Sequence, residues 1–211
     1  HYLVPGKQHF KAQDSKVEGD WSQAAFWTVG GALGAGITAS GVDFASLQGD
    51  KAVVEIMQRM GADIVKNADS VTVNSGATQA TVIDASNCPD IIPVLTVLAA
   101  VSEGTTKIIN AGRLRIKECD RLAAMTSELN KIGAAITEEP EGLTITGKPE
   151  GLRGGVEVDA WNDHRIAMSL AIAAQCCAEP ITLTGAGSVS KSYPDFWQDY
   201  KSVGGKIEVL A

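Results

Sequence analysis

The sequence lacks the local patterns that several common classes of protein require. Its four cysteines form no C-x-x-C pair, and no histidine stands at metal-ligand spacing from them. The chain has no G-x-G-x-x-G phosphate loop and no Ser, His and Asp in the order of a catalytic triad. Its apolar runs are too short, or too rich in glycine, to cross a membrane. We therefore expect neither a metal site nor a membrane-spanning segment.

The chain also lacks an excess of positive charge. It has 18 Lys and Arg against 25 Asp and Glu, a net charge of −7, which counts against a general nucleic-acid or anionic-membrane surface. Its 211 residues suffice for one large domain or two small ones. Cys176 and Cys177 lie in an apolar run, so we expect them to be buried thiols in a reducing, cytoplasmic compartment.

Three segments, at about residues 17–76, 81–147 and 155–211, share the plan strand, helix, strand, helix, strand, strand. The first helix of each unit is apolar nearly all round and should be buried, whereas the second is amphipathic and should lie on the surface. The expected helices are residues 24–33, 51–60, 90–101, 120–132, 163–177 and 194–203. We predict one α/β lobe with pseudo-threefold symmetry, in which residues 77–80 and 148–155 are connecting loops. Residues 1–16 read as an extended linker, so we expect a fragment of a longer protein.

A cationic stretch stands out before the second helix of the second unit. Arg113, Arg115, Lys117 and Arg121 fall within nine positions. A cation in the first turn of a helix opposes the helix dipole, and like charges four apart share a helix face. A bound anion would explain the arrangement, because helix N-termini attract phosphates and carboxylates. A solvated charged face is the alternative.

Similar chemistry occurs where other helices begin. Asp90 can be an N-cap, a role compatible with facing a cleft. Asp163 can also cap a helix, but Arg165 would be a buried cation that needs an anionic partner. On a pseudo-threefold lobe these positions should converge on one face, where cations hold an anionic substrate and carboxylates move protons. That face would hold Asp90, Lys117, Glu118, Arg121, His164, Arg165 and Lys191.

Four motifs in order resemble the 5-enolpyruvylshikimate-3-phosphate synthase family, the shikimate-pathway enzymes that glyphosate inhibits. They are Asn87-Cys-Pro-Asp90, Lys117-Glu-Cys-Asp-Arg-Leu122, Asn162-Asp-His-Arg-Ile-Ala-Met168 and Lys191-Ser-Tyr-Pro-Asp195. The resemblance covers residues 17 to the end and about half of the family protein. It implies a lobe of three βαβαββ units, no metal or organic cofactor, and transfer of the enolpyruvyl group of phosphoenolpyruvate to the 5-hydroxyl of shikimate 3-phosphate with release of phosphate.

The resemblance also implies roles for single residues. Asp90 corresponds to the base for the 5-hydroxyl, Glu118 to the glutamate that handles protons at the phosphoenolpyruvate methylene, and His164 to a motif histidine with a less settled proton role. Lys117 and Arg113 correspond to contacts of shikimate 3-phosphate, although some members have Asn at the place of Arg113. The phosphoenolpyruvate ligands would be Arg121, Arg165 and Lys191.

Two alternatives remain open from the sequence. A UDP-N-acetylglucosamine enolpyruvyl transferase shares the fold and phosphoenolpyruvate, but the motifs around His164 and Lys191 argue against it. A non-catalytic anion-binding lobe is the other. We expect a monomeric parent enzyme whose substrates bind between two lobes, so this chain alone should fold but be essentially inactive.

Overall fold

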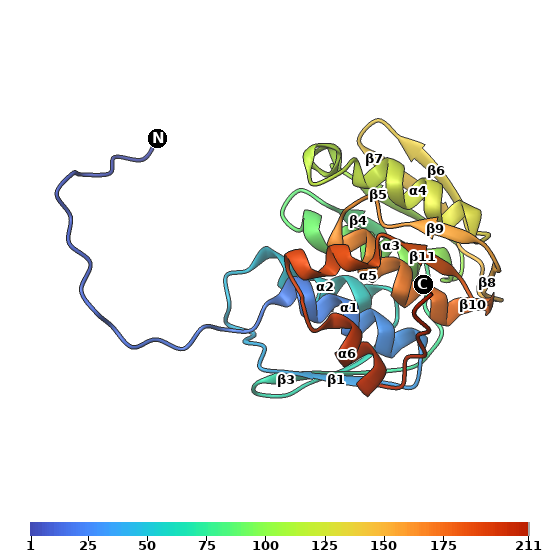
Figure 1. Ribbon diagram of the computed structural model, residues 1–211, viewed down its shortest axis with the longest axis horizontal. Helices are drawn as coiled ribbons and strands as arrows, with labels where there is room; N and C mark the ends of the chain where they lie inside the picture. Colours follow the sequence, from blue (N-terminus) through green and yellow to red (C-terminus); the bar gives the residue numbers. More distant parts are fainter. Residues whose placement is uncertain (211) are drawn as a thin grey trace.

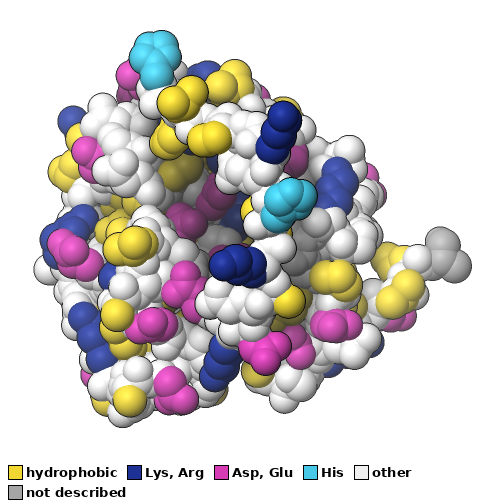
Figure 2. Space-filling model, turned by 90° about the vertical axis from the view of Figure 1, so that its left-hand side faces the viewer, with side chains coloured by type: hydrophobic (Ala, Val, Ile, Leu, Met, Phe, Trp, Pro, Cys, Tyr) yellow, Lys and Arg dark blue, Asp and Glu magenta, His cyan; other side chains and the backbone are white. Residues whose placement is uncertain are grey.

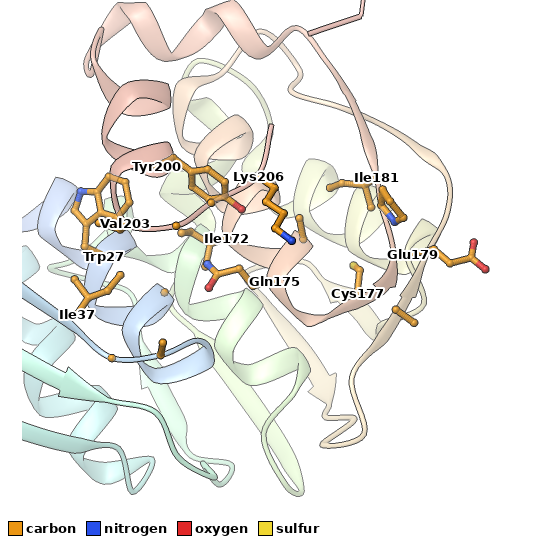
Figure 3. Close-up of a pocket in the computed structure, with 18 residues that line it drawn as sticks. Trp27, Ile37, Ile172, Gln175, Cys177, Glu179, Ile181, Tyr200, Val203 and Lys206 are labelled. Carbon is orange, nitrogen blue, oxygen red and sulfur yellow. The ribbon is translucent and has the colours of Figure 1, made fainter. Parts of the chain in front are cut away.

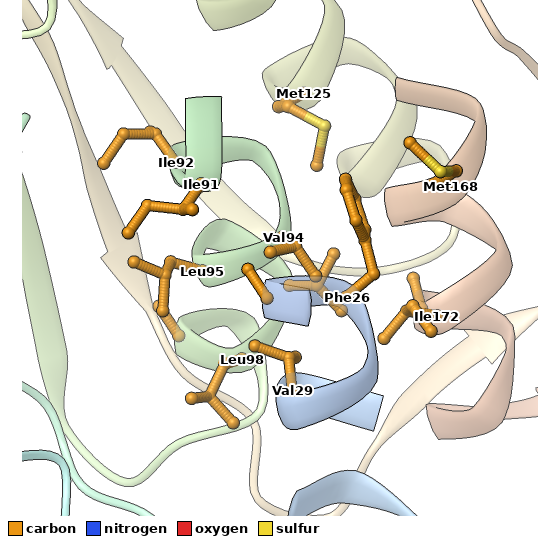
Figure 4. Packing of buried hydrophobic residues seen from close by; sticks show 14 of the residues in the cluster. Phe26, Val29, Ile91, Ile92, Val94, Leu95, Leu98, Met125, Met168 and Ile172 are labelled. Carbon is orange, nitrogen blue, oxygen red and sulfur yellow. The ribbon is translucent and has the colours of Figure 1, made fainter. Parts of the chain in front are cut away.

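Three apolar helices form the middle of the molecule in this computed structural model, which describes residues 1–210. They are α1 (Trp21–Leu33), α3 (Ile92–Ala100) and α5 (His164–Ala173). Every residue of α3 and α5 is buried, as expected of helices that are apolar on all sides. Phe26 and Val29 of α1 lie between α3 and α5 (Figure 4). The prediction of three buried helices is confirmed.

Each of the other helices buries one face only. They are α2 (Ala52–Arg59), α4 (Arg121–Lys131) and α6 (Phe196–Ser202). In α2, Val53 and Met57 are fully buried while Glu55 is exposed. In α6, Phe196 and Tyr200 face inward, four residues apart, as the helical period requires. These are the surface helices that the amphipathic pattern predicts.

Two larger sheets and two short strand pairs cover the helices (Figure 1). The first sheet has the order β1–β3–β2, from β1 (Ile37–Ser40), β2 (Asp63–Lys66) and β3 (Ser70–Asn74), all antiparallel. The second has the order β4–β5–β7–β6, in which only β4 and β5 are parallel. Its strands are β4 (Val82–Asp84), β5 (Thr105–Ile109), β6 (Ala135–Glu139) and β7 (Gly142–Thr146).

The two short pairs are both parallel, and their strands other than β8 belong to the third unit. β9 (Glu157–Asp159) pairs with β11 (Thr182–Thr184), and β8 (Leu152–Gly154) pairs with β10 (Cys177–Glu179). The prediction that residues 148–155 form only a connecting loop is therefore wrong. The loop at residues 77–80 also makes one bridge, between Gln79 and Glu103.

The α/β class is confirmed, but among residues 1–210 only the second unit has all six predicted elements. The first has no opening strand, and the third has no strands after α6. The predicted pseudo-threefold symmetry stays a prediction. Cys176 and Cys177 are half-buried rather than buried, because α5 ends at Ala173 and the chain turns toward the edge strand β10.

Gly31 allows α1 to pack closely against the first sheet. A Cβ added to Gly31 would lie 2.9 Å from both the backbone N of Ile37 and the carbonyl O of Val73, so α1 can lie directly against β1 and β3 only because this position has no side chain. Residues 1–20 contain no helix or strand, and residues 1–16 are exposed and extend away from the body in Figure 1. Within residues 1–210, no helix has the length and apolar character needed to cross a membrane.

Candidate functional site

The candidate site lies at the end of the molecule where the buried helices begin. Its side chains come from the 3-10 turn η2 (Pro89–Ile91), the loop between η3 (Gly112–Ile116) and α4, the start of α4, and the N-cap and first turn of α5. Figure 2 shows the side of the molecule on which α1 begins in Figure 1, and its middle is a hollow lined by acidic and basic side chains. Residues far apart in the sequence thus meet at one place.

Arg121 is the centre of this arrangement and is only 1% exposed. Its Nε lies 2.7 Å from Oδ2 of Asp163, its Nη1 lies 2.8 Å from Oδ1 of Asp90, and its Nη2 lies 2.6 Å from Oε2 of Glu118. Three elements are therefore joined through one guanidinium group, whose planar set of donors suits several carboxylates at once. These protein carboxylates, rather than a bound anion alone, stabilise a cation at the start of α4.

Asp90 is the point at which the cations converge. Its Oδ1 lies 3.2 Å from Nζ of Lys117, and its Oδ2 lies 3.6 Å from Nη2 of Arg165. Burial alone would raise the pKa of this carboxyl, but the charges of Arg165, Lys117 and Arg121 outweigh it and the pKa is lowered. Asp90 does not serve as an N-cap, because neither η2 nor α3 has a side-chain cap. With 29% of its side chain exposed, it faces the hollow as an ionised carboxylate.

Arg165 is the buried cation that the sequence predicts. Its Nη2 donates to Oγ of Ser22 at 3.0 Å, and its Nη1 donates to the carbonyl O of Asp90 at 3.3 Å. Asp163 caps α5 as expected, accepting from the backbone N–H of Arg165 at 2.8 Å. The Asp163 carboxyl is fully buried; burial would raise its pKa, but Arg121 lowers it by more.

His164 lies beside two carboxylates without bonding to either. Its Nδ1 is 3.9 Å from Oε1 of Glu118 and 3.8 Å from Oδ1 of Asp163, and it is a buried atom with no hydrogen bond within residues 1–210. Burial, and then the charge of Arg165, lower the pKa of His164. The ring is therefore neutral at pH 7 and keeps one nitrogen as an acceptor.

The remaining cations are less central. Lys191 is exposed and donates to Oδ1 of Asn162 at 2.8 Å, so it adjoins the Asn162–Arg165 motif without entering the ion-pair cluster. Arg113 is exposed and makes no hydrogen bond or ion pair with the described residues. Arg115 bonds to Asp120 at 2.9 Å and to Glu138 at 2.7 Å, which ties the loop to β6. We read Arg115 as structural.

Sequence reasoning missed two neighbours of the site. Ser22, in the first turn of α1, bonds to Arg165 but carries no motif signal of its own. Asp50, in η1 (Gly49–Lys51), lies close enough to Asp90 for the two charges to interact. Its position could have been found, because it precedes the second helix of the first unit just as Lys117 and Lys191 precede those of the other two units.

A cavity of about 540 Å³ lies at the other end of α5. Figure 3 shows Trp27 and Ile37 on one side of it, with Ile172 and Gln175 near the middle. No group of three or more His, Cys, Asp or Glu side chains in the described part of the chain is arranged to hold a metal ion. The charged cluster, and not the cavity, holds the predicted chemistry-bearing residues.

Comparisons with known proteins agree on one family. A family model described as EPSP synthase (3-phosphoshikimate 1-carboxyvinyltransferase) matches residues 1–200. The chain is 54% identical, over 98% of its length, to the 3-phosphoshikimate 1-carboxyvinyltransferase of Clostridium kluyveri, and 51% identical to that of Clostridioides difficile. A solved EPSP synthase from Acinetobacter baumannii superposes with a TM-score of 0.84 at 31% identity, covering 92% of this chain and 48% of that one. The chain spans about half the length of the curated relatives it matches.

Proposed function

Because this chain belongs to the EPSP synthase family, we propose that it supplies one side of an active site that transfers the enolpyruvyl group of phosphoenolpyruvate to shikimate 3-phosphate. The family expected from the four motifs is confirmed. The substrates, the reaction and the residue roles are proposals for this chain. The observation that carries them is the convergence of Asp90, Lys117, Arg121 and Arg165 around one hollow.

The charges of the site suit two anionic substrates. Lys117 is partly exposed and neutralises Asp90 only in part, so it can also meet the phosphate of shikimate 3-phosphate. Arg165, with its longer contact of 3.6 Å to Asp90, can reorient toward a carboxylate. Exposed Lys191 can reach the phosphate of phosphoenolpyruvate. Arg121 would act partly by ordering Asp90 and Glu118 and partly as a direct ligand.

Two carboxylates would divide the proton transfers. Asp90, ionised among cations, would accept the proton of the 5-hydroxyl as its oxygen attacks C2 of phosphoenolpyruvate. Glu118, whose side chain is 41% exposed, would deliver a proton to the methylene carbon and remove one again when phosphate leaves. A neutral His164, 3.9 Å from Glu118, can accept or relay that proton. The proton on Asp90 would leave with the departing phosphate. The C2–O bond formed to the acceptor then replaces the C2–O bond broken to phosphate, and no oxidant or reductant is needed.

The test uses a fusion of this chain to the segment of the Clostridium kluyveri relative that it does not match. We expect phosphate release that requires both phosphoenolpyruvate and shikimate 3-phosphate, and none from this chain alone. Asp90→Asn should lower turnover by about 10²–10⁴-fold, whereas Asp84→Asn, an exposed aspartate of the same segment, should not.

Two outcomes would overturn the proposal. Phosphate release with UDP-N-acetylglucosamine in place of shikimate 3-phosphate would favour the related transferase. A folded fusion that turns over neither acceptor, or whose turnover is unchanged by Asp90→Asn, would favour a non-catalytic anion-binding lobe. Sedimentation of the active fusion as a single chain would test the expectation of a monomeric enzyme.

A further inference from the structure

The turn Gln48-Gly-Asp50 is fixed against the candidate site from the first unit. The Oε1 atom of Gln48 accepts from the backbone N of Trp21 at 2.9 Å, and its Nε2 donates to the carbonyl O of Gly19 at 2.9 Å. A Cβ added to Gly49 would lie 2.1 Å from the carbonyl O of Asn87. The turn thus packs directly on the segment that carries Asp90, and only glycine permits that approach.

Asp50 makes no ion pair or side-chain hydrogen bond with the described residues, although the charges of Arg165 and Lys117 act on it from farther away. Its Oδ1 is a buried atom without a hydrogen-bond partner among residues 1–210. A half-buried carboxyl without a partner is costly for stability alone. The charged or titratable groups that face it come from every neighbouring element: Asp20 before α1, Cys88 and Asp90 around η2, Lys117 after η3, and Arg165 in α5.

We propose that Asp50 is a positioning residue of the site that acts through Asp90: the two carboxyl groups form a coupled pair, and ionised Asp50 makes Asp90 a stronger base. This inference rests on the proposed function, in which Asp90 accepts the proton of a substrate hydroxyl. Coupling between two like charges is mutual, so each carboxylate favours the protonated form of the other.

The titration of Asp50 agrees with this geometry. Burial, and then the charge of Asp90, raise the pKa of Asp50 to about 6. Asp50 is therefore mostly ionised at pH 7 and protonated below pH 6. When it is protonated, Asp90 loses its negative neighbour and is left among Arg121, Arg165 and Lys117, which weakens it as a base.

The first test needs no turnover and uses the 211-residue chain. The carbon-13 signal of the Asp50 carboxyl should titrate near pH 6, and Asp90→Asn should lower that midpoint by about half a pH unit. Asp69→Asn, an exposed aspartate in the turn between β2 and β3, should leave it unchanged. A midpoint near the ordinary value, or one that Asp90→Asn does not move, overturns the coupling.

Thermal unfolding keeps the inference testable if Asp90→Asn does not fold. Because the pKa of Asp50 in the folded chain is raised above its ordinary value of 3.8, stability is lost progressively between pH 3.8 and about 6, and only part of that loss is present at pH 4.5. Asp50→Asn should therefore raise Tm by about 3 °C at pH 7.5 and by less at pH 4.5. An equal change at the two pH values contradicts an ionisable, coupled Asp50.

The second test separates positioning from folding. In the fusion described above, Asp50→Asn should lower kcat by about three- to tenfold, remove the fall in turnover near pH 6, and leave KM for shikimate 3-phosphate nearly unchanged. Asp50→Glu should restore part of the loss. A changed KM with an unchanged pH profile would overturn the positioning role. An inactive wild-type fusion refutes the proposed function instead, and leaves the titration of Asp50 and Asp90 as an independent result.

Discussion

The two ends of α5 differ in what they hold. At its start, Asp163, His164 and Arg165 are buried among charged side chains from three other segments. At its end, the chain borders a cavity of about 540 Å³ whose only charged lining residues are Glu179 and Lys206. The cavity therefore lies where charged groups are few, and the densest charge lies at the opposite end of α5.

The two ends show that the volume of a cavity and the presence of reactive side chains are separate indicators of a functional site. Burying charges costs free energy unless each is paired, and an apolar replacement is often as stable. The polar end nevertheless keeps three cations and four carboxylates together, which a requirement for folding does not explain. The cavity end of α5 has few charged side chains, so it carries no such free-energy cost of burying charges. Substitutions at the two ends of α5, each with a different expected effect on the free energy of unfolding, can test this difference.

The largest effect is expected from Arg121→Met. Removal of the guanidinium leaves the fully buried Asp163 carboxylate without its charged partner and frees Asp90 and Glu118. We expect a loss of about 3–5 kcal/mol in the free energy of unfolding, measured by urea denaturation of the 211-residue chain. The matched control is Arg113→Met, an exposed arginine of the same stretch, which should change it by less than about 0.5 kcal/mol. Equal effects would show that the pairing around Arg121 contributes little.

A smaller loss is expected from Glu128→Gln in α4. The buried carboxylate accepts from the backbone N–H of Asp159 at 3.0 Å and from Nε1 of Trp161 at 2.9 Å, and it pairs with Lys131. These bonds hold Trp161 in a left-handed conformation, φ 50°, just before α5. An amide has one acceptor oxygen, so one donor would face an NH₂ group. We expect a loss of about 2 kcal/mol.

Urea denaturation again provides the measurement for Glu128→Gln. Glu103→Gln is the control, since Glu103 is exposed and its side chain makes no hydrogen bond within residues 1–210. If the two variants were equally stable, Glu128 would not be needed to order the turn that leads into the polar end of α5.

His164→Gln should remove part of the pH dependence of stability, with a smaller effect still. Burial and Arg165 lower the pKa of His164 below its ordinary value of 6.5. The unfolded chain therefore binds this proton more readily, so the stability contributed by His164 is present above pH 6.5 and is lost as the pH falls. Wild type should lose more stability than His164→Gln between pH 7.5 and 5.5.

The comparison of His164→Gln with wild type cancels the opposite titration of Asp50, which both proteins contain. His9→Gln, in the exposed N-terminal segment, is the control and should behave as wild type. A parallel pH dependence in wild type and His164→Gln would mean that His164 is not buried in its neutral form.

The sequence predicted which helices and strands form better than it predicted where each of them ends. Apolar periodicity located α1, α3 and α5, because helices without a polar face have to be buried. It also led us to expect buried thiols at Cys176 and Cys177, since an apolar run does not reveal where α5 stops and β10 begins. The short parallel strand β8 was missed for a similar reason: its pairing with β10 depends on contacts far apart in the chain.

The site was predictable as a set of residues but not as a set of contacts. Motif spacing identified Asp90, Arg121 and Arg165, because Asp90 and Arg165 stand at the starts of apolar helices and Arg121 is a cation in the first turn of α4. That Asp163 neutralises Arg121, and that Asp50 faces Asp90, depends on how three units pack. The only sequence signal for Asp50 is its position before the second helix of the first unit, which Lys117 and Lys191 occupy in the other two units.

The smallest effect is expected at the cavity, from Gln175→Ala. Gln175 is exposed, lines the cavity and donates no hydrogen bond to the described residues. Its truncation should change the free energy of unfolding by less than about 0.5 kcal/mol and leave turnover of the fusion unaltered. A loss of turnover comparable to that of Asp90→Asn would contradict the contrast, because it would make the cavity end part of the reaction. If Gln175→Ala leaves the free energy of unfolding unchanged while Arg121→Met lowers it strongly, the paired charges at the start of α5, and not the cavity at its end, mark the functional site.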